Sequence, residues 1–228
     1  MKPYDVTQRR PEMTIQWNSE NQVGRLTLNQ PPSNTMTMGF FRELRILVTE
    51  ISMDHTLKAI LISGSGRHYS SGADITELLN NVNQQTMLEN YQAMLMLEQL
   101  KIPLISAIRG ACLGSAFELA LFSHFRICAE EAVLGLPEST FNLMPGLGGI
   151  QRVAALAGRA KAVEIILRGN TFTGREALES GLVDAVVPKN EVLPCSLAFA
   201  DALPQTLTGI DRKALLYKYF KPSHATIS

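Results

Sequence analysis

Two glutamates, Glu118 and Glu138, lie in a stretch, residues 105–152, that holds much of the chain's capacity for acid–base chemistry. Glu118 stands in the apolar segment 115–122, in which only alanine, leucine and phenylalanine accompany it after the first serine. A carboxylate in such surroundings needs hydrogen-bond partners or a raised pKa, and groups of this kind are enriched at catalytic sites. Glu138 follows twenty residues later in the sequence Gly-Leu-Pro-Glu. The pair is therefore a candidate for general acid–base catalysis.

Glycine-rich turns accompany both acids. One turn, 110–114, precedes the segment with Glu118, and another, 145–152, leads into an expected helix. Glycine lets a backbone approach a ligand closely, and the start of a helix offers free amide groups to a polarised carbonyl. Two acids and two sets of amides suffice for acid–base chemistry on a substrate that forms an oxyanion. The spacing alone fits an ordinary α/β core, with turn glycines and helix-capping acids, equally well.

The composition describes a globular chain of balanced charge. Hydrophobic residues make up 46% and charged residues 18% of the 228 residues, enough for a sizeable core in one domain. The formal net charge is +0, which argues against a nucleic-acid partner. Near-zero charge with a high apolar content also favours a protein that buries surface in an oligomer.

The patterns of cysteine, histidine and hydropathy bear on the cellular compartment, on metal binding and on membrane association. The three cysteines, an odd number without CxxC spacing, favour a reduced, cytoplasmic compartment. The four histidines show no metal-binding spacing, so we expect no metal. No run reaches the roughly 18 apolar residues of a membrane span, and the N-terminus has no apolar signal region. We therefore expect no membrane partner.

The order of the expected elements predicts an α/β fold, because strand, helix and strand follow one another with helical and strand periodicities. Strands are expected at 14–17, 23–28, 59–64, 103–108 and 182–188. Helices are expected at 38–52, 75–79, 87–100, 115–122, following the turn 145–152, at 160–167, from 173, at 191–202 and at 210–220. We divide the chain into a loose extension, 1–11, a core, 12–188, and a short C-terminal helical region, 189–228.

The loop 65–75 leaves the carboxyl end of the expected strand 59–64, the place where open α/β sheets bind ligands. It ends in a glycine, Ala73 and Asp74 just before a helical segment, so the amide of Ala73 can point at a substrate oxygen. The alternative is a plain helix entry with Asp74 as a first-turn acid.

Several segments match, in order, motifs of one known family. They are Asn34 in its proline loop, 69–75 (YSSGADI), 110–120 (GACLGSAFELA), 136–138 (LPE), 145–152 (PGLGGIQR), 181–184 (GLVD) and 187–188 (VP). Through them the chain resembles the crotonase superfamily, the enoyl-CoA hydratases and isomerases. The resemblance covers about residues 12–220 in one register, and several motifs in order are far more specific than any one.

The resemblance implies an α/β, crotonase-like spiral of ββα units with a mostly parallel sheet core and a shortened C-terminal helical region. It implies an acyl-CoA thioester as the substrate, so coenzyme A is part of the substrate and no separate cofactor is expected. It also implies a homotrimer or a dimer of trimers.

The resemblance also assigns roles by motif position. The backbone amides of Ala73 and Ser115 would form an oxyanion hole for the thioester carbonyl. Glu118 and Glu138 would hold and activate a water for addition across the α,β double bond, and the amide of Gly146 would help to hold that water. The same loops supply further substrate-binding positions: Ser71, Gly72, Asp74, Ile75 and Gly114.

The chain departs from the family pattern at three places. Ser115 stands where the family usually has glycine, and its hydroxymethyl group narrows the expected pocket. Thr76 replaces a basic residue, which weakens the case for a nucleotide phosphate contact there. The sequence ends at Ser228, earlier than in family members that carry roughly two further helices over the acyl pocket. Either a neighbouring subunit supplies that cover or the pocket is more open.

Both glutamate positions are filled, so the leading interpretation is an enoyl-CoA hydratase that adds water syn to a trans-2-enoyl-CoA. A Δ3,Δ2-enoyl-CoA isomerase is the runner-up, since it needs only one base, for which Glu138 is the better candidate. A specialised dehydratase, which would use the same glutamates and backbone amides, is a further alternative. A catalytically weak acyl-CoA-binding subunit is the alternative from another class, because of Ser115 and the short C-terminus.

Overall fold

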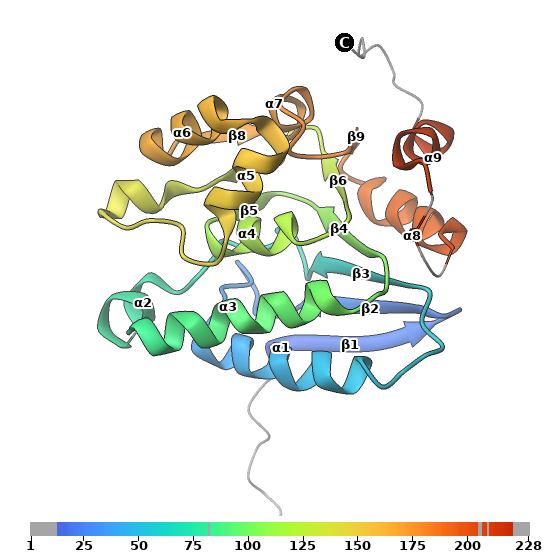
Figure 1. Ribbon diagram of the computed structural model, residues 1–228, viewed down its shortest axis with the longest axis horizontal. Helices are drawn as coiled ribbons and strands as arrows, with labels where there is room; N and C mark the ends of the chain where they lie inside the picture. Colours follow the sequence, from blue (N-terminus) through green and yellow to red (C-terminus); the bar gives the residue numbers. More distant parts are fainter. Residues whose placement is uncertain (1–12, 82, 205–206, 209, 221–228) are drawn as a thin grey trace, which may run out of the picture.

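A computed structural model describes residues 13–81, 83–204, 207–208 and 210–220 (Figure 1). Its larger sheet has the strand order β1-β2-β3-β4-β6-β9, and a second sheet has the order β5-β7-β8. Within the larger sheet β1 and β2 are antiparallel and all other neighbours are parallel. The predicted mostly parallel α/β sheet is confirmed. The strands are β1 (Ile15–Glu20), β2 (Val23–Leu28), β3 (Ala59–Gly64), β4 (Leu104–Ile108), β5 (Ala111–Leu113), β6 (Phe125–Ala129), β7 (Val133–Gly135), β8 (Thr171–Thr173) and β9 (Ala185–Val187).

Helices pack on the larger sheet and against one another. In Figure 1, α1 and α3 run side by side, and α8 lies against β3, β4 and β6. The helices are α1 (Met38–Ile51), α2 (Ile75–Asn81), α3 (Gln84–Gln99), α4 (Ser115–Leu121), the 3₁₀ helix η1 (Pro137–Phe141), α5 (Gly149–Ala157), α6 (Arg159–Arg168), α7 (Gly174–Glu179), α8 (Val192–Ala202) and α9 (Arg212–Tyr219). Within the ranges described, no helix is both long and apolar enough to cross a membrane.

Side-chain caps fix the starts of α1, α2 and α3. Thr37, Asp74 and Asn83 each accept a hydrogen bond from the backbone amide three residues later, at 3.0 to 3.3 Å. Such a cap stabilises a helix by about 1 kcal/mol. Asp74, which the plain helix entry predicts to be a first-turn acid, instead lies one residue before α2 and caps its start.

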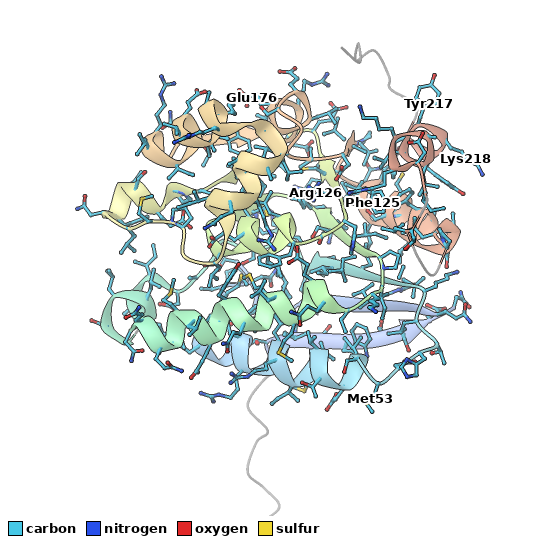
Figure 2. All side chains as sticks on the ribbon, viewed as in Figure 1. Met53, Phe125, Arg126, Glu176, Tyr217 and Lys218 are labelled. Carbon is cyan, nitrogen blue, oxygen red and sulfur yellow. The ribbon has the colours of Figure 1, made fainter. Side chains whose placement is uncertain are left out.

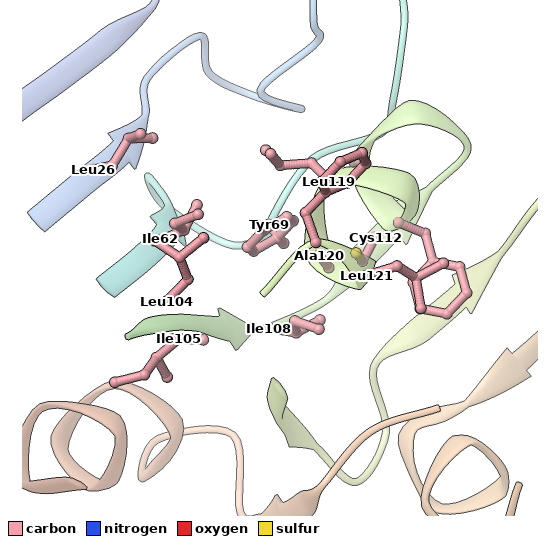
Figure 3. Close-up of a cluster of buried hydrophobic side chains, with 14 of the residues drawn as sticks. Leu26, Ile62, Tyr69, Leu104, Ile105, Ile108, Cys112, Leu119, Ala120 and Leu121 are labelled. Carbon is pink, nitrogen blue, oxygen red and sulfur yellow. The ribbon is translucent and has the colours of Figure 1, made fainter. Parts of the chain in front are cut away.

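The core joins the larger sheet to α4. Figure 3 shows Leu26, Ile62 and Leu104 of the strands facing the same region as Tyr69 and Leu119, and all five side chains are buried. Burying one large apolar side chain contributes about 1.5–3 kcal/mol. This packing holds α4, and with it Glu118, rigidly against the sheet.

A buried ion pair fastens β6 to the segment before β9. Arg126 is 3% exposed, and its guanidinium lies 2.9 Å from Asp184 and donates to the carbonyl of Leu182. Figure 2 shows Arg126 and its neighbour Phe125 in the interior, whereas Tyr217 and Lys218 of α9 lie at the edge of the molecule. An arginine at this depth needs such partners, because an unpaired buried charge is strongly destabilising.

Several short elements differ from the sequence prediction. Residues 110–114 were expected to be a loop, but Ala111–Leu113 form β5, which pairs with β7. β6, β7 and β8 were not predicted, and the last strand is shorter than 182–188. The three-residue strands β5, β7 and β8 carry no readable periodicity, so only their partners reveal them, and in β6 the buried Arg126 interrupts the apolar run. The extension 1–11 lies outside the described residues, and the boundary at 188 stays a prediction.

Candidate active site

A cavity of about 270 Å³ lies between α1, α2 and α3 on one side and α4, η1 and the loop 143–147 on the other. Every site residue proposed from the sequence lines it, although these residues come from four separate segments. They are Ser71, Gly72, Ala73, Asp74, Ile75, Gly114, Ser115, Glu118, Glu138 and Gly146. The structure brings these positions together; their chemical roles stay predictions.

Glu118 is held by the glycine-rich turn that precedes α5. Its Oε1 accepts hydrogen bonds from the amides of Leu147 and Gly149, both at 2.8 Å. The side chain is 1% exposed. A Cβ at Gly149 would lie 2.9 Å from Oε1 of Glu118, so the close approach of this turn requires glycine. The turn therefore fixes the direction of the carboxyl group.

Burial raises the pKa of Glu118 to about 7, against an ordinary value of 4.5. The amides of Gly149 and Leu147 lower this pKa because they favour the charged form, whereas the negative charge of Glu138 raises it. A carboxyl group with a pKa near neutrality can both give and take a proton at neutral pH. This is the range that a general acid–base group needs.

The raised pKa of Glu118 makes stability depend on pH. An unfolded glutamate ionises near pH 4.5 and the folded one near pH 7, so the folded state binds more protons in this window. The free energy of unfolding then falls as pH rises through the window, by up to about 3 kcal/mol. We expect Glu118→Gln, which cannot ionise, to gain stability relative to the wild type between pH 4.5 and pH 7. Urea unfolding of both proteins at the two ends of the window measures the difference, and parallel curves would contradict the raised pKa.

Glu138 lies in η1 and faces the same cavity. Its Oε2 is buried and has no hydrogen-bond partner within the part of the chain that the structure describes. Its Oε1 lies 3.1 Å from where a Cβ of Gly114 would stand. Burial also raises the pKa of Glu138. A buried carboxyl oxygen without a partner is costly, so it is a natural contact for a ligand.

Two backbone amides that line the cavity are also free. Neither the N–H of Ala73 nor that of Ser115 donates a hydrogen bond within the described ranges. The two segments approach closely, since a Cβ at Gly72 would lie 3.5 Å from the nitrogen of Ser115. Gly72 and Gly114, which line the cavity, have φ of +93° and +52°, a backbone region that favours glycine. The arrangement suits a pair of donors to one carbonyl oxygen.

The side chain of Asn34 binds the loop that leads to Ala73. Its Nδ2 donates to the carbonyls of Ser65, His68 and Tyr69, while its Oδ1 accepts from the amide of Gln30. The side chain is 2% exposed and its φ is +53°. Asn34 therefore positions the loop that leads to Ala73 without touching the cavity itself.

The sequence did not identify the apolar wall of the cavity, which includes four methionines. Met87 of α3 is one of these methionines. A Cβ at Gly146 would overlap the terminal methyl group of Met87, so the turn and this wall lie in close contact. The further lining residues are Met36, Met38, Phe41, Glu77, Leu78, Asn90, Pro137, Phe141, Leu143, Met144 and Leu147.

Comparison with known proteins decides the family. Residues 18–211 match the family model described as enoyl-CoA hydratase/isomerase. The chain belongs to the enoyl-CoA hydratase/isomerase family. It is 38% identical over 199 residues to a probable enoyl-CoA hydratase of Bacillus subtilis, an alignment that covers 82% of this chain and 76% of the relative. No group of His, Cys, Asp and Glu in the described residues of this family member could hold a metal ion.

One solved structure and one longer protein are also similar to this chain. A crystal structure of an enoyl-CoA hydratase from Bacillus anthracis has a TM-score of 0.77 and 33% identity, covering 82% of this chain and 75% of that one. The crotonase-like fold is therefore confirmed. The fatty acid oxidation complex subunit alpha of Shewanella amazonensis is 36% identical over 193 residues, which are 81% of this chain but 27% of that protein.

Proposed function

We propose that this protein is an enoyl-CoA hydratase, which adds water syn across the double bond of a trans-2-enoyl-CoA. The observation that carries the proposal is the convergence of Glu118, Glu138 and the free amides of Ala73 and Ser115 on one cavity. Coenzyme A enters as part of the substrate, and hydration requires no further cofactor.

The thioester carbonyl accepts hydrogen bonds from the amides of Ala73 and Ser115, where the negative charge of the enolate develops. One such donor is typically worth about 3 kcal/mol of barrier. Glu118 and Glu138 hold the water between them, one as base and one as acid. The oxygen of the water bonds to the β-carbon, one carboxylate takes its proton, and the other carboxyl group gives a proton to the α-carbon. The two carboxyl groups together carry one proton in this state, because each negative charge disfavours the other.

Both carboxyl groups in the cavity favour the hydratase over the isomerase. Proton transfer along an acyl chain needs one base, whereas addition of water needs a base and an acid. The test offers crotonyl-CoA and a trans-3-enoyl-CoA to the purified protein and follows the absorbance of the conjugated thioester. Loss of absorbance with crotonyl-CoA supports the hydratase. Gain of absorbance with the second substrate alone identifies an isomerase, and no change with either leaves only acyl-CoA binding.

Ser115 gives a prediction about the acyl pocket. Its side chain lines the cavity, and its amide, not its hydroxyl, is the proposed donor. We expect Ser115→Gly to keep crotonyl-CoA hydration within a few-fold, to broaden the range of acyl chains, and to lower stability by at most about 0.5–1 kcal/mol. Values of kcat/KM for short and branched enoyl-CoA substrates measure this effect. A collapse of activity would mean that the hydroxyl group takes part in the chemistry.

A homotrimer or a dimer of trimers is proposed as the assembly. The chain has no net charge, and several large apolar side chains are exposed on α6 and its surroundings, among them Val163 at 50% and Leu167 at 67%. Such exposure is reduced when copies associate. Light scattering at micromolar concentration should give a mass of three or six times 25.1 kDa. A mass of one chain would contradict the proposal.

A further inference from the structure

The α3 wall of the cavity carries one polar side chain, Asn90, among apolar neighbours. Asn90 is 6% exposed and lines the cavity about one turn after Met87. Within the described part of the chain, its side chain makes one hydrogen bond, from Nδ2 to the thioether sulfur of Met38 at 3.8 Å. A thioether is a weak acceptor. The side chain therefore keeps one N–H and its carbonyl oxygen for another partner.

Neither helix formation nor core packing explains an asparagine at this position. Asparagine forms helices less readily than leucine or methionine, because its side chain competes for backbone groups. The other buried residues of α3 are apolar: Ala93, Met94 and Leu97. A buried polar group with unused hydrogen-bonding capacity destabilises the folded state. Residues that break local rules without a structural gain concentrate at functional sites.

The charges around the cavity decide which polar group on a ligand fits Asn90. The charged side chains among the described lining residues are all acidic: Asp74, Glu77, Glu118 and Glu138. An anionic group on the acyl chain would face these carboxyl groups without a cation and is disfavoured. A neutral hydroxyl group can accept from Nδ2 and donate to Oδ1 of Asn90 at the same time.

We propose that Asn90 recognises a neutral hydroxyl group on the acyl chain, beyond the double bond that takes up water. The inference rests on the proposed function, which supplies the acyl thioester, and adds that the preferred chain is hydroxylated. The methionines that line the cavity pack against the hydrocarbon of the acyl chain, because their side chains are flexible and polarisable. A plain hydrocarbon chain leaves one N–H and the carbonyl oxygen of Asn90 without a partner from the ligand.

The test compares a straight-chain trans-2-enoyl-CoA with its ω-hydroxy and ω-carboxy derivatives over a series of chain lengths. At the length that brings the hydroxyl group to Asn90, the wild type should show kcat/KM at least about tenfold higher for the ω-hydroxy substrate. Asn90→Leu should abolish this preference. The matched control is Gln92→Leu, an exposed position on the same helix, which should retain it. Equal kcat/KM values across the whole wild-type series, a preference for the carboxy substrate, or a preference that survives Asn90→Leu would overturn the proposal.

Measurements of ligand binding and of thermal stability test the role of Asn90 independently of hydration. Calorimetry with saturated acyl-CoA and ω-hydroxyacyl-CoA needs no turnover, and the wild type should again prefer the hydroxylated ligand about tenfold. If this preference is found while no enoyl-CoA is hydrated, the proposed function fails and the role of Asn90 stands. Asn90→Leu should keep or raise the Tm, whereas a purely structural asparagine would lower it when replaced. If Asn90→Leu does not fold, Asn90→Ala is compared with the wild type in its place.

Discussion

Glu118→Gln should lower kcat/KM for hydration of crotonyl-CoA by about 10³-fold, within the range expected for loss of a general acid–base group. The glutamine keeps an oxygen for the amides of Leu147 and Gly149, so α4 and the glycine turn stay in place. The variant loses proton exchange at a group whose pKa burial raises to about 7. Since the group acts on the transition state, kcat and kcat/KM should fall together.

The affinity of Glu118→Gln for a saturated acyl-CoA should change little, which separates a chemical defect from a binding defect. Glu179→Gln is the matched control: this glutamate is exposed at the end of α7, outside the cavity, and its replacement should not change turnover. Near-wild-type hydration by Glu118→Gln would remove Glu118 from the mechanism.

Glu138→Gln should lower hydration by about 10²- to 10³-fold. The Oε2 atom of Glu138 is buried without a partner among the described residues, so little structure depends on its charge. Replacing a carboxyl group whose pKa is raised by burial should leave the Tm unchanged or raise it. Stopped assays on crotonyl-CoA, with Tm measured on the same samples, report both effects.

The two single variants also distinguish hydratase from isomerase chemistry. An isomerase with Glu138 as its base loses turnover in Glu138→Gln but keeps it in Glu118→Gln. A hydratase that uses both groups loses turnover in each. A defect confined to Glu138→Gln would therefore contradict the proposed function and favour the isomerase.

Much of the fold could be predicted from the sequence where an element is long and its period is unbroken. The pattern at 38–52 and the apolar run at 59–64 gave α1 and β3 almost to the residue. The strands β1 and β2 were also predicted, although β1 extends to Glu20. β5 and β7 could not be predicted, because three residues between turns form a strand only when the partner strand is present.

The positions of the candidate site could be predicted from ordered motifs, but their partners could not. Glu118 stands out because a charge interrupts an apolar segment, yet nothing in the sequence shows that the amides of Leu147 and Gly149 hold it. Asn90 lies in a helix of mixed polarity, where its burial has no signature in the sequence. Both facts depend on contacts between segments far apart in the chain.

A double-variant cycle on crotonyl-CoA hydration tests most directly the claim that Glu118 and Glu138 act on one water. The wild type, the two glutamine variants and the variant with both substitutions are compared by kcat/KM under one set of conditions. Groups that act as a unit are strongly non-additive, so the double variant should be about as slow as the slower single variant. If the wild type hydrates crotonyl-CoA but the two defects multiply, the glutamates act independently and the shared-water mechanism is wrong.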